Sequence, residues 1–435
     1  MPRVFGSPLG SDFLSVLVDG LHDRLRDAPP QEWARVEIFV NTARMRRRLK
    51  TLLTQGPARV LPKIRLITDL VDDPVYCDLP PAVPPLQRRL EIAQLVGQLI
   101  DQIPDLAPQS AVFDLSDSLA NLMGEMQFEG IDPADLRTLD VTDVSGHWDR
   151  ALKFINIVQR YFERDAQPDS DARLRATVMG LISAWETSPP THPIILAGST
   201  GSRGTTYDLM SAVAALPQGA VILPGFDFDL PQTIWESLAN LKTGEDHPQF
   251  RFARLMADGN LTRDDIAPWS QAQDINHARN RLVSLALRPA PMTHHWLREG
   301  PHLTDLDNAT QGITWVEAPD QRIEALSIAL RLRQAADQGK TAAVITPDRN
   351  LTRRIASALG RWNIVPDDSA GIPLMLTAPG RFLLHVLDFA PGKVTAENLL
   401  VMLKHPLTHT GKNRGDHLLF THDLEAYLTE LHSTH

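Results

Sequence analysis

Hydrophobic positions at the start of the chain alternate between the pattern of β-strands and that of α-helices. Residues 3–5 are a short strand candidate, and the largely apolar run Arg35–Val40 (RVEIFV) is a stronger one. A helix is predicted over Phe13–Leu25, because its large apolar residues recur every three or four positions. For the same reason we expect a second helix around residues 45–53. The order strand, helix, strand, helix indicates an α/β fold.

The hydrophobic period becomes helical between two proline-rich junctions, residues 72–85 (DDPVYCDLPPAVPP) and 187–193 (TSPPTHP). Proline at this density interrupts helices and central strands, so both junctions are interpreted as boundaries. Four amphipathic segments follow one another over residues 86–187. Helices with one apolar face need partner helices to bury that face, which predicts an inserted helical subdomain over 86–187.

Strand-like runs return after the second junction. Ile194–Ala197 (IILA) and Ala220–Leu223 (AVIL) are continuous apolar segments. Such runs are typical of parallel strands that are covered on both faces. We therefore expect residues 1–73 and 193–285 to form one α/β domain around a single parallel sheet.

A third proline-rich junction covers residues 288–312, and the alternation then starts again. Strands are expected at Ile313–Glu317 and Ala342–Ile345, each followed by a helix. This pattern predicts a second α/β domain over residues 312–435.

Composition excludes several classes of protein. Of 435 residues, 43% are hydrophobic and 22% charged, as in globular proteins. The single cysteine, Cys77, excludes a disulfide framework or a four-cysteine metal site within this sequence and favours a cytoplasmic protein. No run is long enough for a membrane span or a signal peptide. Since the net charge is −10, contact with nucleic acid requires a local basic patch.

A glycine-rich turn between the first strand and the first helix, residues 6–11 (GSPLGS), lies where a phosphate-binding loop would lie. A working loop needs a lysine that reaches the β- and γ-phosphates, and this turn has none. The next residue, Asp12, would repel a triphosphate. We interpret Gly6, Ser7, Gly10 and Ser11 as a degenerate phosphate loop that holds no cofactor, or as a turn in which Ser11 caps the helix.

The turn Gly198–Gly204 (GSTGSRG), between an apolar strand and a helix, is similar to a dinucleotide-binding turn. Ser199, Thr200 and Arg203 are its candidates for contact with a phosphate or a nucleic-acid backbone. The turn lies far from the first βα unit, and the following strand ends without an acidic residue, Asp227 being the nearest. The alternative is a tight structural turn.

One predicted helix carries five cations without an acidic neighbour: Arg44, Arg46, Arg47, Arg48 and Lys50. They form either a phosphate-binding face or an ordinary solvated face. A metal site is not expected, because Pro406 separates His405 from His409 and disturbs the shared helical face that a zinc-binding pair needs.

Several long segments resemble the AddB family of alphaproteobacterial type, subunits of the AddAB helicase–nucleases that repair double-strand breaks. The resemblance covers most of the chain, and its segments occur in order. They are LPKIRLITDL (61–70), IILAGSTGSRGTTYDLMSAVAALPQGAVILPGFD (194–227), HPQFRFARLM (247–256), TAAVITPDRNLTRRIASALGRWNIVPDDSAGIPLMLTAPGRFLL (341–384) and LLVMLKHPL (399–407).

The resemblance implies a RecA-like (P-loop helicase-type) domain with a helical insertion, followed by a second helicase-like domain, with decayed motor motifs. Ala197-Gly198 would stand where an active helicase carries a magnesium-binding Asp-Glu, and Thr42–Arg48 where one contacts single-stranded DNA. Thr346 and Arg349 are further candidates for DNA contact. The implied partners are single-stranded DNA and an AddA-type helicase–nuclease subunit. We expect this chain to hydrolyse no ATP, to hold no cofactor and to bind no membrane.

The chain departs from that family in two respects, its length and its cysteines. The family's proteins are much longer and end in a nuclease domain with an iron–sulfur cluster held by four cysteines, whereas this sequence has 435 residues and one cysteine. We therefore expect an N-terminal portion of such a protein and carry over no nuclease activity. A stand-alone Rossmann-type enzyme that binds a nucleotide at Gly198–Gly204 is the alternative.

Overall fold

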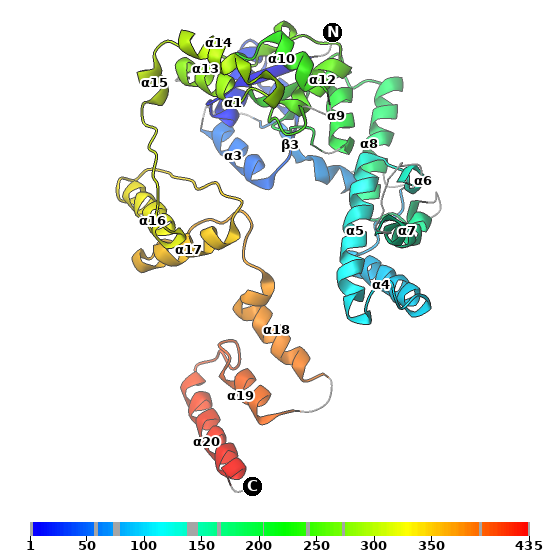
Figure 1. Cartoon of the computed structure of the whole chain (residues 1–435), viewed down its shortest axis with the longest axis vertical. Coiled ribbons are helices and arrows are strands. Elements are labelled where there is room, and N and C mark those ends of the chain that lie inside the picture. The colour runs from blue at the N-terminus through cyan, green and yellow to red at the C-terminus, as the bar shows by residue number, and fades with distance from the viewer. Residues whose placement is uncertain are drawn as a thin grey trace. The chain divides into compact units, whose positions relative to one another are not determined.

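A computed structural model of the chain describes residues 3–55, 60–72, 79–136, 147–162, 167–202, 204–240, 244–271, 275–390 and 394–433 (Figure 1). The chain folds as two compact units, Met1–Ile313 and Thr314–His435. Among the described residues, no helix has both the length and the apolar character needed to cross a lipid bilayer.

The first unit is built on a six-stranded sheet in which all pairings are parallel. In sheet order, the strands are β3 (Lys63–Leu66), β2 (Glu37–Val40), β4 (Ile194–Ala197), β5 (Gly219–Phe226), β1 (Val4–Pro8) and β6 (Ala267–Pro268). The predicted α/β fold with a parallel sheet is confirmed. β2 pairs directly with β4, Ile38 lying opposite Ile195, so segments from both sides of the helical stretch share one sheet.

Helices cover both faces of this sheet. On one face lie α1 (Phe13–Arg24) and α3 (Ala43–Thr54), where helices were predicted, and their Leu17 and Leu49 are fully buried. The other face is covered by α8 (Ser170–Thr187), α9 (Gly204–Ala215), α10 (Gln232–Leu238) and α12 (Phe250–Asp258). Each such buried apolar side chain contributes roughly 1.5–3 kcal/mol. Burial on both faces explains why the central strands consist of continuous apolar residues.

The described residues between β3 and β4 form helices joined by loops and short 3₁₀ turns. The α-helices are α4 (Pro85–Gln102), α5 (Val112–Glu129), α6 (Pro133–Leu136), α7 (His147–Val158) and α8. Helices α4 and α5 lie against each other (Figure 1), and Ile92, Val96 and Ile100 of α4 pack with Leu119 and Met123 of α5 in a small core of their own. Phe128 at the C-terminal end of α5 and Leu174 and Val178 of α8 belong to the core on one face of the sheet. Through these residues the helical group packs against the sheet of the first unit.

The last part of the first unit follows the edge strand β6 and is helical in its described residues. In the described residues, β6 is followed by α13 (His277–Ala286), α14 (His294–Glu299) and α15 (Leu306–Thr310). A short helix near the start of the unit, α2 (Pro30–Arg35), precedes β2. Asn280 of α13 donates from Nδ2 to the carbonyl of Leu9, 2.9 Å away, and Arg279 donates from Nε to the carbonyl of Ala309, 2.8 Å away. Helix α13 therefore binds both the loop after β1 and helix α15.

Helices α16 (Gln321–Asp337) and α17 (Arg349–Leu359) open the second unit and pack on each other. Ala325 and Ala329 on α16 meet Ile355 and Leu359 on α17. Three further helices follow, α18 (Ala378–Asp388), α19 (Ala396–Lys404) and α20 (Arg414–Ser433), with α19 packed against both of its neighbours.

The strands expected in this second part are absent from its described residues, so the predicted second α/β domain is not supported. Residues 313–317 and 342–345 have no regular secondary structure and pair with no strand of the described residues, and Trp315 and Ile345 are 84% and 98% exposed. The apolar pattern is that of a strand, but a strand persists only when neighbouring strands bind its backbone groups. The described residues of this unit supply helices and loops instead.

Candidate functional site

The loops that follow β1, β2, β4 and β5 meet at one edge of the sheet, because parallel strands all end on the same side. In open α/β sheets this edge is the usual place for a ligand. Asn41, after β2, donates from Nδ2 to the carbonyl of Gly198, after β4, at 3.1 Å. This hydrogen bond and the one from Asn280 to Leu9 hold the loops in fixed positions.

The first glycine loop is shorter than the sequence suggested. Gly6 and Ser7 belong to β1, and the turn comprises only residues 9–11. A side chain at Gly6 would collide with Phe226 and Phe228, so this glycine makes room for aromatic packing. Ser11 does not cap α1: its hydroxyl donates to the carbonyl of Pro8, 2.6 Å away, and the capping position belongs to Asp12.

Asp12 places a carboxylate at the start of α1, where a phosphate loop would place phosphate. Its Oδ2 accepts hydrogen bonds from Arg48 Nη2 at 2.7 Å and from Ser15 Oγ at 2.9 Å. Partial burial alone would raise the pKa of Asp12, but the hydrogen bonds from Arg48 and Ser15 outweigh it and hold this pKa below its ordinary value. The group is therefore an anion at neutral pH, at a helix end that favours negative charge.

The second glycine loop forms two left-handed turns, at Gly198 (φ +79°) and Gly201 (φ +66°). Ser199 is buried, and its Oγ accepts from the backbone N–H of Gly201 at 3.2 Å, so this hydroxyl stabilises the turn itself. Thr200 is exposed, and Arg203 lies outside the described residues. The Ser199 hydroxyl is thus engaged within the turn, whereas Thr200 is accessible to solvent.

Helix α9, which follows this loop, also has an acidic side chain at its N-terminus. Glu129, the last residue of α5, accepts from the backbone N–H of Gly204 through Oε1 at 3.0 Å. Next to it, the Thr205 hydroxyl donates to the carbonyl of Phe128 at 2.9 Å. The N–H group that would hold a phosphate in a dinucleotide site is thus bound by the helical segment. The sequence did not point to Glu129, because it lies 75 positions before Gly204.

Apolar side chains fill the space above Gly198. A side chain added there would collide with Met45 Cε from α3 and would lie 3.0 Å from Phe13 Cε1 of α1. Both residues are partly buried against the core on that face of the sheet. Asp12 thus lies at the start of α1, Glu129 lies at the start of α9, and the apolar side chains of Met45 and Phe13 lie beside Gly198 between them.

Some cations of the basic helix α3 are already paired with carboxylates. Two of its cations have acidic partners: Arg46 binds Asp69 and Arg48 binds Asp12, each at 2.7 Å. The expectation of a helix without acidic neighbours was therefore wrong, because both carboxylates come from other segments. Within the described part of the chain, Arg47 and Lys50 are exposed and have no ion-pair partner.

The position of the cations on α3 follows from the helical period. Leu49 and Leu53 are buried, and Arg47 lies on the opposite side of the helix, flanked by Arg44 and Lys50 at three-residue spacing. All three are exposed. Their stripe is the strongest candidate for contact with a phosphate backbone.

Three other candidate residues already have local roles. The Thr42 hydroxyl accepts from the backbone N–H of Met45 at 3.1 Å and so caps α3. In the second unit, the Thr346 hydroxyl accepts from the N–H of Asp348 at 3.0 Å. Arg349 pairs with Asp368 at 3.2 Å. Thr42 thus serves to begin α3, whereas Thr346 and Arg349 stabilise their own segment.

A buried polar group lies at the end of β5. Asp227 is 4% exposed and accepts from the backbone N–H of Asp229 at 2.9 Å. Burial raises its pKa, against the lowering effect of its hydrogen bond with Ser284. Arg288 in turn donates to Ser284 Oγ at 3.1 Å and to Glu299 at 3.3 Å. Asp227 is therefore held inside the protein and is not presented to a ribose.

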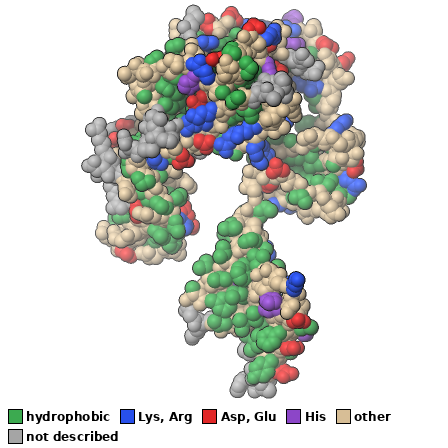
Figure 2. Space-filling model, turned by 180° about the vertical axis from the view of Figure 1, so that it is seen from behind, with side chains coloured by type: hydrophobic (Ala, Val, Ile, Leu, Met, Phe, Trp, Pro, Cys, Tyr) green, Lys and Arg blue, Asp and Glu red, His purple; other side chains and the backbone are tan. Residues whose placement is uncertain are grey.

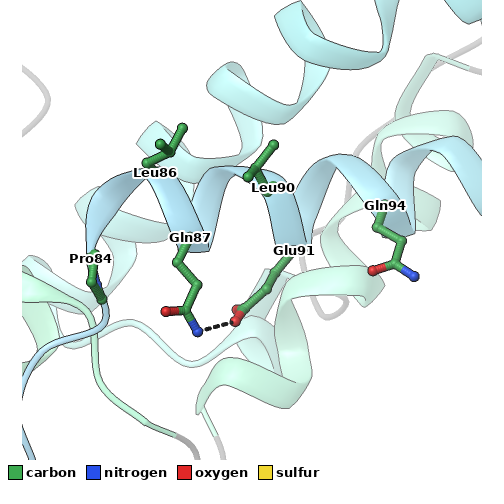
Figure 3. A pocket seen from close by; sticks show the side chains of 6 residues that line it. All are labelled: Pro84, Leu86, Gln87, Leu90, Glu91 and Gln94. Atoms are coloured by element: carbon green, nitrogen blue, oxygen red, sulfur yellow. Dashed lines mark hydrogen bonds between the residues drawn. The ribbon is translucent and has the colours of Figure 1, made fainter.

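A shallow groove of about 440 Å³ lies along α4, away from the sheet edge. It is lined by Pro84, Leu86, Gln87, Leu90, Glu91 and Gln94 (Figure 3). Leu86 and Leu90 point to one side of the helix, while Gln87 donates to Glu91 on another side, 3.0 Å away. None of the candidate residues predicted from the sequence lines this groove.

No model of a known protein family matches the chain, and no characterised protein matches it either.

Proposed function

We propose that this chain is an inactivated helicase-like module of a DNA double-strand-break repair complex, which binds a DNA strand without hydrolysing ATP. It would act as a scaffold beside an AddA-type helicase–nuclease subunit. The resemblance of the sequence to the AddB family suggests this role. The observation that best supports the loss of ATP chemistry is that Asp12 and Glu129 occupy the N-termini of the two helices after the glycine loops.

Electrostatics explains why these carboxylates oppose nucleotide binding. A helix N-terminus attracts anions because it carries partial positive charge and unsatisfied N–H groups. At α9 the Glu129 carboxylate already accepts from the N–H of Gly204, and at α1 the Asp12 carboxylate lies at the capping position, so a phosphate at either end would meet a like charge. The first loop also lacks the lysine that would offset the charge of a triphosphate.

DNA would be bound through its phosphates along α3. Arg47 and Lys50 are exposed cations without acidic partners in the described residues, and Arg44 extends the same face. Phosphate contacts give affinity without sequence preference. We therefore expect binding that is independent of sequence and sensitive to salt.

The test compares nucleotide and DNA binding by the same protein. Labelled single-stranded oligonucleotides are titrated by fluorescence anisotropy at a series of salt concentrations. ATP and NAD(P) are titrated by calorimetry, and ATP turnover is measured with DNA present. Salt-dependent DNA binding without nucleotide binding or turnover supports the proposal. Binding of NAD(P) would instead support the Rossmann-type enzyme, and ATP turnover would exclude an inactivated module.

The role of α3 is tested with the double variant Arg47→Gln/Lys50→Gln. The slope of log affinity against log salt is negative, and the variant should make it less steep by roughly 1.5 for two lost phosphate contacts. The matched control is Arg322→Gln/Lys340→Gln, which removes an exposed arginine and an exposed lysine from the other unit. Equal slopes for both variants would mean that α3 carries only a solvated face.

A further inference from the structure

Helix α17 packs on α16 through one apolar face. Its Ile355 and Leu359 are buried against Ala325 and Ala329 of α16. Because a helix turns by about 100° per residue, this contact fixes which side of α17 is inward and which side is left in solvent.

The solvent side of α17 carries three arginines. Arg353 and Arg354 lie in the helix and Arg361 lies in the 3₁₀ turn Gly360–Trp362 that directly follows it, and all three are exposed. At about 100° per residue they fall within roughly a third of the helix circumference, and neither Ile355 nor Leu359 lies in that sector. Their positive charges are therefore presented to solvent together.

These three arginines are not neutralised by carboxylates of the described residues. None of them has an ion-pair or hydrogen-bond partner there, whereas Arg349 at the start of the helix pairs with Asp368 at 3.2 Å. Helix α17 itself has no acidic residue, and Asp348 just before it accepts from the backbone N–H of Asn350 at 2.7 Å. The sector thus keeps a net positive charge.

Two polar side chains lie among the arginines. Asn350 and Ser357 fall in the same sector by the same helical spacing, and both are exposed. The sector therefore offers guanidinium, amide and hydroxyl donors and no apolar side chain. These are the groups by which proteins bind the phosphate oxygens of a nucleic-acid backbone.

We propose that the outward face of α17, formed by Asn350, Arg353, Arg354, Ser357 and Arg361, binds the phosphates of a DNA strand as a second contact besides α3. The inference rests on the proposed DNA-binding function and assigns part of it to the second unit. Arg353 and Arg361 are roughly 12 Å apart along the helix axis, a length that covers several nucleotides of a strand at about 3.4 Å each.

The composition of this face selects a nucleic acid over a protein or a membrane. A protein partner needs apolar side chains at the centre of its interface, and Figure 2 shows hydrophobic side chains gathered over the part of the chain that holds α18 to α20 instead. A helix that binds a membrane inserts its apolar side into the lipid, whereas the apolar side of α17 is packed on α16. The face of α17 offers charge and hydrogen-bond donors, which suffice for phosphate.

The experiment titrates the full chain with a labelled single-stranded oligonucleotide across a salt series, followed by fluorescence anisotropy. Arg353→Gln/Arg354→Gln/Arg361→Gln removes three phosphate contacts, so the negative slope of log affinity against log salt should become less steep by roughly 2. Arg353→Lys/Arg354→Lys/Arg361→Lys keeps the charges and should keep most of the slope. An unchanged slope in the glutamine variant, or an equal loss in the lysine variant, overturns the proposal.

The matched control is Arg281→Gln/Arg381→Gln/Lys412→Gln, which removes the same charge from exposed positions on α13, on α18 and just before α20. It should leave the slope as it is in the unchanged chain. Equal flattening by both triple variants would mean that net charge sets the slope, and would refute the site. Because all the substituted residues are exposed, the urea midpoint of unfolding should stay the same in every variant.

A competitor tests the choice of nucleic acid. In the Arg47→Gln/Lys50→Gln background, which leaves α17 as the proposed contact, unlabelled oligonucleotide should displace the labelled strand at a lower concentration of charge than poly-glutamate does. Equal displacement by poly-glutamate would show that the face binds acidic protein as well as DNA, and would refute the proposal.

The same titrations separate this inference from the proposed function. If the chain binds DNA and only the α3 variant flattens the slope, the inference about α17 is wrong and the proposed function stands. If the α17 variant flattens the slope but the chain turns over ATP, the contact on α17 stands and the inactivated module does not. Absence of DNA binding by the unchanged chain overturns both.

Discussion

Asp12 and Arg48 form an ion pair that joins the start of α1 to α3, with Oδ2 and Nη2 2.7 Å apart. The two side chains are 49% and 56% exposed, so solvent screens the pair, and its contribution to stability is at most about 1 kcal/mol. The pair has a second consequence. It neutralises a cation that adjoins the proposed DNA-binding stripe of α3.

Replacing Asp12 with serine should therefore strengthen DNA binding. The substitution frees Arg48 and removes a negative charge, so the slope of log affinity against log salt should become steeper by roughly 0.7–0.9. Anisotropy on single-stranded oligonucleotides measures this slope. The control is Asp23→Ser near the end of α1, which breaks the exposed ion pair with Arg26 just after that helix. If both variants behave alike, the effect comes from net charge and not from Arg48.

Replacing Gly198 with alanine should destabilise the first unit by about 2–4 kcal/mol. The left-handed backbone disfavours a side chain, and the added methyl group would crowd Met45 and Phe13. The double variant Met45→Ala/Gly198→Ala should lose less unfolding free energy than the sum of the two single losses, because removal of the methionine also removes the crowding. Urea unfolding measures all three differences.

The control for that series is Gly97→Ala in the middle of α4. A side chain there meets nothing within 4 Å, so the alanine should stabilise the protein by about 0.5–1 kcal/mol. If Gly198→Ala were as well tolerated as Gly97→Ala, the space above Gly198 would be open and could admit a nucleotide.

Glu129→Ala should lower the free energy of unfolding by about 1 kcal/mol, because it leaves the first N–H group of α9 without its acceptor. Glu129→Gln keeps an acceptor oxygen and should lose less. Glu125→Ala, an exposed position on the same helix, should change the free energy by less than about 0.5 kcal/mol. Chemical unfolding of the three variants gives the comparison. If Glu129→Ala changed the unfolding free energy as little as Glu125→Ala does, Glu129 would not cap α9.

The buried carboxyl of Asp227 predicts a dependence of stability on pH. Its pKa is raised in the folded protein, so the stability it contributes is fully present below the unfolded value of about 3.8 and is lost as pH rises through the folded value. Asp227→Asn removes this titration. Relative to the unchanged chain, the variant should thus become more stable as pH rises from 4 to 7. Parallel curves of unfolding free energy against pH for the two proteins would contradict the prediction.

The sequence predicted the central strands well and the edges of the sheet poorly. Apolar runs identified β2, β4 and β5, because strands covered on both faces exclude polar residues. The edge strands β3 (KIRL) and β6 (AP) escaped, since one mixes charged with apolar residues and the other has only two residues. The runs that begin at Ile313 and Ala342 show the converse error: they were predicted as strands from their apolar pattern, but that pattern does not supply the partner strand that a strand needs.

The candidate site was predicted in position but not in detail. Glycines marked two of the loops at the carboxyl edge of the sheet, and the clustered arginines marked α3. What occupies the edge depends on contacts across the chain, such as Glu129 with Gly204 and Asn41 with Gly198, 75 and 157 positions apart. No local pattern distinguishes a carboxylate that will reach a helix end from one that will remain in solvent.

The pairing of β1 with β5 has a consequence for synthesis of the protein. Val4 lies opposite Val221, so the first strand of the chain obtains its neighbour only after more than 200 further residues have been made. At the usual pace of translation this interval is roughly 10–45 s. During that time the apolar side chains of β1 and α1 lack the sheet that later buries them. A nascent chain of this kind invites chaperone binding, and slowing the ribosome before β5 should increase aggregation more than the same delay placed after it.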